Sequence, residues 1–125
     1  MPATPTQIKD FLSAFKQSAQ LDLNVIPRQK NLEFLTRHGF TPKERKEVLL
    51  GLQVGDYCKG PEEDDKARGP KDIWFFGVDY EGVQVYIKLQ LVEEKDEETG
   101  DMMRHAKCIS FHGAEHEMRF PYRGR

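Results

Sequence analysis

Apolar residues near the start of the chain recur at intervals of three and four positions. At this spacing, side chains line one face of an α-helix. The pattern predicts a helix over residues 6–20 with an apolar stripe that packs against the rest of the protein. The residues of the stripe are Ile8, Phe11, Leu12, Phe15 and Ala19.

The pattern changes after this helix. Apolar residues alternate over residues 21–26, which predicts a short strand that stops at Pro27. The apolar face of this strand consists of Leu21, Leu23 and Val25. A helical pattern returns over residues 30–38, and Gly39 occupies the position at which a left-handed residue commonly ends a helix. The apolar markers of this second helix are Leu32 and Leu35.

A capping box marks the start of a third helix. Thr41 stands before Pro42 at the first helical position, and Glu44 follows three residues after the threonine. The threonine and glutamate side chains can each bind the backbone of the other, which fixes a helix start. We expect this helix over residues 42–52. Its buried residues are expected to be Val48, Leu49 and Leu52.

The stretch from residue 55 to residue 71 is rich in residues that interrupt regular structure. Two Gly-Pro pairs, at 60–61 and 69–70, enclose a run of charged residues. This composition predicts a loop with a flexible part over residues 59–71. Loops of this length are uncommon in compact domains. The segment is therefore a candidate for contact with a substrate or partner, or else a solvated connector.

Three strands are expected in the second half of the chain. Residues 73–78 and 83–92 form a hairpin around a four-residue loop, and residues 107–112 form the third strand. Because side chains alternate between the two faces of a strand, those of the last strand divide between a core side and an opposite side. The core side receives Ile109 and Phe111, and the opposite side receives Cys108, Ser110 and His112. If the strands are antiparallel neighbours, one sheet face brings together Tyr86, Lys88, Ser110 and His112.

The order of elements is one helix, a strand, two helices and three strands. This order predicts an α+β fold in which the N-terminal helices pack on one face of a small antiparallel sheet. The 125 residues fit a single domain, 1–125, with a tail at about 119–125.

Charge is distributed unevenly along the chain. The formal net charge is −2, but fourteen of the 21 acidic residues fall between residues 54 and 101. The flanking segments are basic, so an anionic substrate such as a nucleic acid is permitted. We find no secretion signal and no apolar run long enough for a membrane span, and the two cysteines match no metal-binding spacing. We therefore expect a cytoplasmic protein that makes no membrane contact.

Tyrosine, lysine and histidine on one sheet face supply the groups needed to cleave RNA without a metal. A base takes the proton of the ribose 2′-hydroxyl, a cation stabilises the phosphate, and an acid protonates the 5′-oxygen. Histidine suits proton transfer near neutral pH. Two other interpretations stay open, because these could be ordinary surface residues or part of a zinc site. The zinc ligands would come from His105, Cys108, His112, Glu115 and His116.

Three further groups of side chains are candidates for contact with RNA. Arg28, Lys30 and Asn31 precede the second helix, where a phosphate could bind, although Asn31 could equally cap the helix. Tyr57 and Lys59 follow the third helix. The tail interleaves arginines with aromatic residues, which contact RNA by charge and stacking or simply pack on the domain. These tail residues are Arg119, Phe120, Tyr122, Arg123 and Arg125.

An ordered series of segments resembles the toxins of the motility quorum-sensing regulator (MqsR) family. The segments are Arg28-Gln-Lys-Asn31, Leu35-Thr-Arg-His-Gly-Phe40, Asp56-Tyr57-Cys-Lys59-Gly-Pro61, Ile73-Trp74-Phe-Phe-Gly77, Val85-Tyr86-Ile-Lys88 and Ile109-Ser-Phe-His112. The resemblance spans about residues 21–122. It implies a fold like that of the RelE-type toxins, endoribonuclease activity on messenger RNA, and a cognate antitoxin protein that silences the enzyme.

The residues proposed for catalysis in that family correspond here to Lys59, Phe75, Tyr86 and His112. Phe75 stands where the family has glutamine, and His112 stands where it has lysine, so Lys88 is a candidate for the missing positive charge. The resulting hypothesis is an mRNA-cleaving toxin that uses no metal or other cofactor. Its catalytic residues would be His112, Tyr86, Lys88 and Lys59, and its substrate contacts Arg28, Lys30, Asn31, Tyr57 and Ser110. The alternative is a noncatalytic module whose acidic loop and exposed sheet face bind a partner such as a DNA-binding antitoxin.

Overall fold

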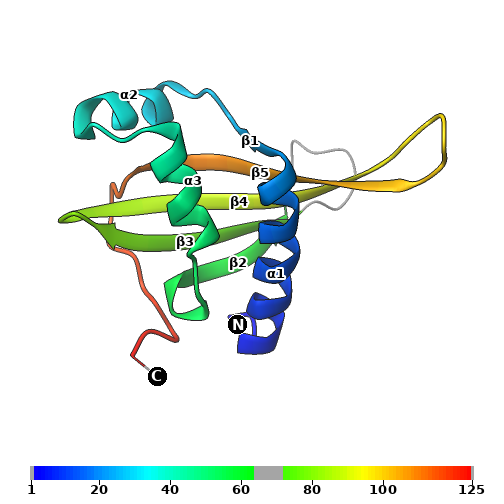
Figure 1. Ribbon diagram of the computed structural model, residues 1–125. Coiled ribbons are helices and arrows are strands. Elements are labelled where there is room, and N and C mark those ends of the chain that lie inside the picture. Colours follow the sequence, from blue (N-terminus) through cyan, green and yellow to red (C-terminus); the bar gives the residue numbers. More distant parts are fainter. Residues whose placement is uncertain (1, 64–71, 125) are drawn as a thin grey trace.

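The computed structural model describes residues 2–63 and 72–124. Within these residues the chain forms three α-helices, one short 3-10 helix and one five-stranded sheet (Figure 1). The elements are α1 (Pro5–Leu21), β1 (Leu23–Val25), α2 (Gln29–His38), α3 (Pro42–Leu50), η1 (Val54–Asp56), β2 (Tyr57–Glu63), β3 (Asp72–Tyr80), β4 (Val83–Lys95) and β5 (Met102–Gly113). The predicted α+β class is confirmed.

α1 forms where the apolar stripe predicts it. The helix begins at a capping box in which the Thr4 hydroxyl accepts from the Gln7 backbone N–H, and the Gln7 side chain accepts from the Thr4 N–H. All five residues of the predicted stripe are buried. Leu21, expected in the next strand, is instead the last helical residue and is 90% exposed. None of the helices in the described part of the chain is long and apolar enough to cross a membrane.

α2 and α3 are separated by the left-handed Gly39, whose φ of 67° costs a glycine little. This helix end is confirmed, but the buried side of α2 differs from the prediction. Asn31 and Phe34 face the interior, whereas Leu32 is exposed. The apolar spacing alone therefore did not identify the packed side of this helix.

α3 begins at the predicted capping box. The Thr41 hydroxyl accepts from the Glu44 backbone N–H, and the Glu44 carboxylate accepts from the Thr41 N–H. The helix ends at Leu50, earlier than predicted, although Leu49 and Leu52 are both buried. Leu49 in the last turn of α3 and Leu52 just after the helix therefore both pack in the core.

The five strands lie in the order β1-β5-β4-β3-β2. Four of them are antiparallel neighbours, but β1 runs parallel to β5. The prediction of a purely antiparallel sheet is therefore wrong, because β1 and β5 are far apart in the sequence and no hairpin fixes their direction. α1 and α3 cover one face of the sheet (Figure 1). The core between them includes Phe15, Leu49, Phe76, Ile87 and Phe111.

The segment expected to be a loop begins with a strand. β2 forms the edge of the sheet and pairs only with β3. An edge strand tolerates Pro61 because it does not need every backbone N–H for pairing. Gly60 has a φ of 104°, and a Cβ atom there would lie 2.8 Å from the carbonyl oxygen of Ile73. The rest of the predicted flexible loop, residues 64–71, lies outside the described residues.

The hairpin between β3 and β4 is tighter than predicted. Tyr80 pairs directly with Val83, so the turn contains only Glu81 and Gly82. Both have positive φ, at 49° and 80°, as two-residue turns between twisted strands require. β4 and β5 are longer than expected and extend beyond the other strands as a two-stranded arm (Figure 1).

Candidate active site

The sheet face opposite α1 and α3, called the outer face below, carries the side chains expected to gather there. The alternation in β4 places Ile87 in the core and its neighbours Tyr86 and Lys88 on the outer face. Tyr86 pairs with His112 of β5, and Lys88 pairs with Ser110. The prediction that these four residues share one face is confirmed.

β5 reaches this arrangement through a β-bulge at Ile109. Leu89 pairs with Cys108 and Lys88 pairs with Ser110, which leaves Ile109 as an extra residue without a partner. The bulge changes the alternation of side chains, so Cys108 is buried in the core and Ile109 is only half-buried. The faces predicted for Cys108 and Ile109 are therefore wrong, because an uninterrupted strand was assumed.

Asn31 of α2 holds this bulge in place. Its side-chain nitrogen Nδ2 donates to the carbonyl oxygens of Ile26 (2.9 Å) and Ile109 (3.0 Å). Its oxygen Oδ1 accepts from the backbone N–H of Phe111 at 2.9 Å. Asn31 is 1% exposed, and the N-terminal cap of α2 is Arg28. Asn31 therefore neither reaches the outer face as a substrate contact nor caps the helix; it positions β5.

A second bulge, in β2, brings Lys59 to the outer face. Tyr57 pairs with the core residue Phe76, whereas Lys59, two residues later, pairs with the outer-face residue Phe75. Residues two apart in a regular strand would share a face, so Cys58 is the extra residue that separates them. Lys59 therefore joins Tyr86 and Lys88 even though it lies two strands away from β4.

Phe75 forms a platform between two lysines. The Nζ atom of Lys59 lies 4.5 Å from the centre of the Phe75 ring, and that of Lys88 lies 5.5 Å from it. These are cation-π contacts, in which the ring face attracts the ammonium groups. Phe75 thus orients cations at the position where the resemblance implies a hydrogen-bonding glutamine.

Arg28 adds a guanidinium group beside Ser110. Its Nη1 donates to the Ser110 hydroxyl at 3.3 Å. Ser110 is 1% exposed, so it positions Arg28 and is not itself the substrate contact that the sequence predicted. Burial lowers the pKa of Lys88, and the nearby charges of Arg28 and Lys59 lower it further. A bound anion would relieve this repulsion between like charges. The surface is therefore suited to hold a phosphate. We call the group the outer-face cluster: Arg28, Lys59, Tyr86, Lys88, Ser110 and His112.

His112 is 9% exposed and packs beside Tyr86, with the ring centres 5.5 Å apart. Its Nδ1 lies 2.9 Å from the carbonyl oxygen of Gly113, which can only accept, so Nδ1 carries a hydrogen. In the neutral ring, Nε2 then has a free lone pair that can take a proton. Burial raises the pKa of Tyr86, so the phenol keeps its proton at neutral pH. The His116 ring also packs against Tyr86, with the ring centres 5.8 Å apart. No sequence pattern predicted this contact.

Tyr57 does not reach the outer face. Its side chain is buried in the core, where the hydroxyl accepts from the Ala3 backbone N–H at 3.0 Å and donates to the Gly60 carbonyl oxygen. The bulge at Cys58 turns Tyr57 and Lys59 to opposite faces. The hydroxyl therefore links the N-terminus to the edge strand.

Replacing Tyr57 by phenylalanine is expected to lower the free energy of unfolding by about 1–3 kcal/mol, because the buried N–H of Ala3 and the half-buried carbonyl of Gly60 lose this partner. Denaturant unfolding measures this change. Tyr80→Phe is the matched control, since the Tyr80 hydroxyl makes only a 3.4 Å contact with Glu44; its effect should stay below about 0.5 kcal/mol. An equal decrease in the free energy of unfolding in the two variants would contradict the role assigned to the Tyr57 hydroxyl.

Lys30 lies at the margin of the cluster. Its Nζ is 2.6 Å from the Glu115 carboxylate, and this hydrogen bond lowers the pKa of Glu115. Lys30 and His112 both line a hollow of about 300 Å³ between α2 and the end of β5. Lys30 is therefore close to the proposed substrate surface, with its charge partly neutralised by Glu115.

The residues of the alternative zinc site are not brought together. Cys108 lies in the core, whereas His112 lies on the outer face. Burial raises the pKa of the Cys108 thiol to about 12, which keeps it protonated. Among residues 2–63 and 72–124, no three histidine, cysteine, aspartate or glutamate side chains gather closely enough to hold a metal ion.

The C-terminal segment packs across the outer face beside the cluster. A Cβ atom on Gly77 would lie 2.7 Å from Met118 and 3.0 Å from Phe120, so these two side chains cover the glycine. The Arg123 guanidinium lies 3.5 Å from the centre of the Phe120 ring, and the Tyr122 hydroxyl donates to the Ala3 carbonyl. Packing of the tail on the domain is thus confirmed for these residues, and Arg125 lies outside the described residues.

Comparison of the chain with protein families, known proteins and solved structures finds no match. Function must therefore be inferred from the outer-face cluster and from the resemblance of the motif segments.

Proposed function

We propose that this protein is a metal-independent endoribonuclease that cleaves messenger RNA by attack of a ribose 2′-hydroxyl on the adjacent phosphate. The observation that supports this proposal is the outer-face cluster, in which His112, Tyr86 and Lys88 lie together with two further cations. The resemblance to MqsR-type toxins supports RNA as the substrate.

His112 acts as the base in this proposal. Its Nε2 takes the proton of the 2′-hydroxyl, the 2′-oxygen forms a bond to phosphorus, and the bond between phosphorus and the 5′-oxygen breaks. The products are a 2′,3′-cyclic phosphate and a 5′-hydroxyl. The hydrogen bond between Nδ1 and Gly113 keeps the ring oriented for this role.

Lys88 supplies the proton for the leaving 5′-oxygen. Its lowered pKa makes it a stronger acid than an ordinary lysine. Lys88 and His112 are diagonal neighbours on adjacent strands, a separation of roughly 7–8 Å that leaves room for a phosphate between them. Arg28 holds the phosphate oxygens, and Lys59 joins it when its ammonium group exchanges the Glu62 carboxylate, 3.2 Å away, for the phosphate. Tyr86, which keeps its proton, donates a hydrogen bond to orient the group.

The resemblance also supports a cognate antitoxin as partner. The arm formed by β4 and β5 carries exposed acidic residues that would repel RNA and attract a basic protein surface. These residues are Glu93, Glu94, Glu97, Glu98 and Asp101. A short neighbouring reading frame with a helix-turn-helix pattern would support this pairing.

The proposed activity is tested by incubating the purified protein with a defined transcript in the presence of EDTA. Cleavage should persist, and the fragments should carry 2′,3′-cyclic phosphate and 5′-hydroxyl ends. Tyr86→Phe and Lys88→Met should each slow cleavage by about tenfold or more, whereas the arm variant Lys95→Met should not. Loss of cleavage with EDTA would contradict metal independence. Absence of cleavage at every protein concentration would instead favour the noncatalytic binding module.

A further inference from the structure

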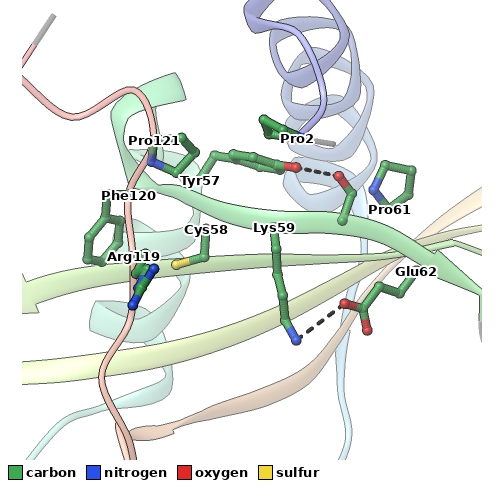
Figure 2. Close-up of a pocket in the computed structure, with 10 residues that line it drawn as sticks. Pro2, Tyr57, Cys58, Lys59, Pro61, Glu62, Arg119, Phe120 and Pro121 are labelled. Atoms are coloured by element: carbon green, nitrogen blue, oxygen red, sulfur yellow. Dashed lines mark hydrogen bonds and ion pairs between the residues drawn. The ribbon is translucent and has the colours of Figure 1, made fainter.

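A cavity of about 620 Å³ opens between β2 and the C-terminal segment. Figure 2 shows Cys58 pointing from β2 toward Arg119 and Phe120, while Lys59 and Glu62 extend from the same strand. The cavity extends around this edge strand: Figure 2 shows Pro2, Tyr57 and Pro61 on the other side of the β2 ribbon from Cys58 and Lys59. The volume is within the range of small-molecule sites in proteins, so the cavity is large enough for one nucleotide unit.

Lys59 connects this cavity to the outer-face cluster. Its side chain lines the cavity and also lies over Phe75, which contacts Lys88. β2 lies two strands from β4, a separation of about 10 Å across the sheet. A phosphate that lies between Lys88 and His112 and also contacts Lys59 would therefore place the base of an adjoining nucleotide at the mouth of the cavity.

The lining combines apolar walls with a few polar groups. On the side of β2 that carries Cys58 and Lys59, Phe120 supplies apolar surface. Burial raises the pKa of the Cys58 thiol to about 11, so it stays neutral. Arg119 is exposed at the rim, where its guanidinium can donate to a base edge or a sugar. This combination of aromatic surface and arginine is typical of sites that bind unpaired bases.

The negative charge of Glu62 favours a base rather than a phosphate as the occupant of the cavity. Its carboxylate lies 3.2 Å from Lys59 Nζ and would repel a second phosphate inside the cavity. The same carboxylate can accept from the amino or imino hydrogens of a neutral base. The charge distribution therefore favours a base in the cavity and the backbone phosphate on the outer face.

We propose that the cavity between β2 and the C-terminal segment binds the nucleobase next to the scissile phosphate and so contributes to sequence preference. This inference rests on the proposed RNA-cleaving function, because it places the phosphate on the outer-face cluster. Arg119 and Phe120 contact the base, and Lys59 is shared between the base site and the phosphate site.

The test uses short RNAs with a 2′-deoxy nucleotide at the scissile position, which blocks cleavage but not binding. One series carries normal bases. In the other series, each RNA has one abasic site, placed in turn at each position next to the scissile nucleotide. Wild-type affinity, measured by fluorescence anisotropy, should fall by about tenfold for one abasic position, the loss expected when one stacked base is removed. In Arg119→Gln and Phe120→Leu the same abasic site should change affinity by less than about threefold, because the base has already lost its contacts.

Arg104→Gln is the matched control, since Arg104 lies on the arm and pairs with Glu93; it should respond to the abasic site as the wild type does. Thermal melting confirms that each variant is folded. Equal affinity of the wild type for every abasic RNA, or no RNA binding at all, would overturn the base site. If the protein binds RNA in a base-dependent way but does not cleave the matching all-ribose RNA, the base site is supported and the proposed enzyme is contradicted. The failure of the base site and the failure of the enzyme are therefore distinguishable.

Discussion

Replacing His112 by glutamine is expected to slow RNA cleavage by about 10²- to 10⁴-fold, the usual contribution of a positioned base. Glutamine retains a polar side chain but cannot take the proton of the 2′-hydroxyl. The measurement is the single-turnover rate on an RNA with one scissile bond. Affinity for the 2′-deoxy form of that RNA should change by less than about threefold, because Arg28 and Lys59 still hold the phosphate.

Two further variants separate proton transfer from charge at this position. His105→Gln is the matched control, because His105 lies farther along β5, 3.8 Å from Glu94, and its loss should leave the rate unchanged. His112→Lys restores a cation but holds its proton at neutral pH, so its rate should rise toward pH values of about 10. Full activity of His112→Lys at pH 7 would show that position 112 contributes charge rather than acting as a base.

The helices were predictable because their signals are local. The apolar stripe of α1 and the capping box of α3 are each encoded within a few consecutive residues. Leu32 shows the limit of this reasoning: it fits the apolar spacing of α2 but is exposed, because the packed side of the helix is set by contacts of Asn31 with β5.

The candidate site was predictable only where a strand is regular. Tyr86 and Lys88 lie in an uninterrupted part of β4, so their common face follows from alternation. Cys108 and Ile109 were assigned to the wrong faces because the bulge depends on a side chain 78 residues away. No local pattern in β5 contains that information.

β2 illustrates a different limit. Gly60 and Pro61 have low strand propensity, so the segment has the composition of a loop. It becomes a strand because β3 offers an unpaired edge, and the register shift between Lys59 and Glu62 accommodates the glycine and proline. Lys59 could therefore be named from the resemblance, but its position over Phe75 depends on the tertiary pairing.

Replacing Asn31 by alanine is expected to lower the free energy of unfolding by about 3–5 kcal/mol. The Ile109 carbonyl and the Phe111 N–H lose their hydrogen-bond partner, at a cost of about 1–3 kcal/mol each before relaxation. The Ile26 carbonyl still accepts from the Arg28 N–H at 2.8 Å. Asn31→Asp should be similarly destabilising: its carboxylate can still accept from Phe111 but faces the carbonyl oxygens of Ile26 and Ile109. Denaturant unfolding measures both variants, and Asn24→Ala, at an exposed asparagine in β1, should change stability by less than about 0.5 kcal/mol.

The same substitution tests whether the bulge positions the active site. Under conditions in which Asn31→Ala remains folded, cleavage should still fall by about tenfold or more, because displacement of reacting groups by about 1 Å carries a large cost. Ser110 and His112 follow the bulge directly, so a change in register would move both relative to Tyr86 and Lys88. A less stable variant with the wild-type rate would show that the bulge forms without the Asn31 amide. A variant as stable as the wild type would show that the three hydrogen bonds do not stabilise the fold.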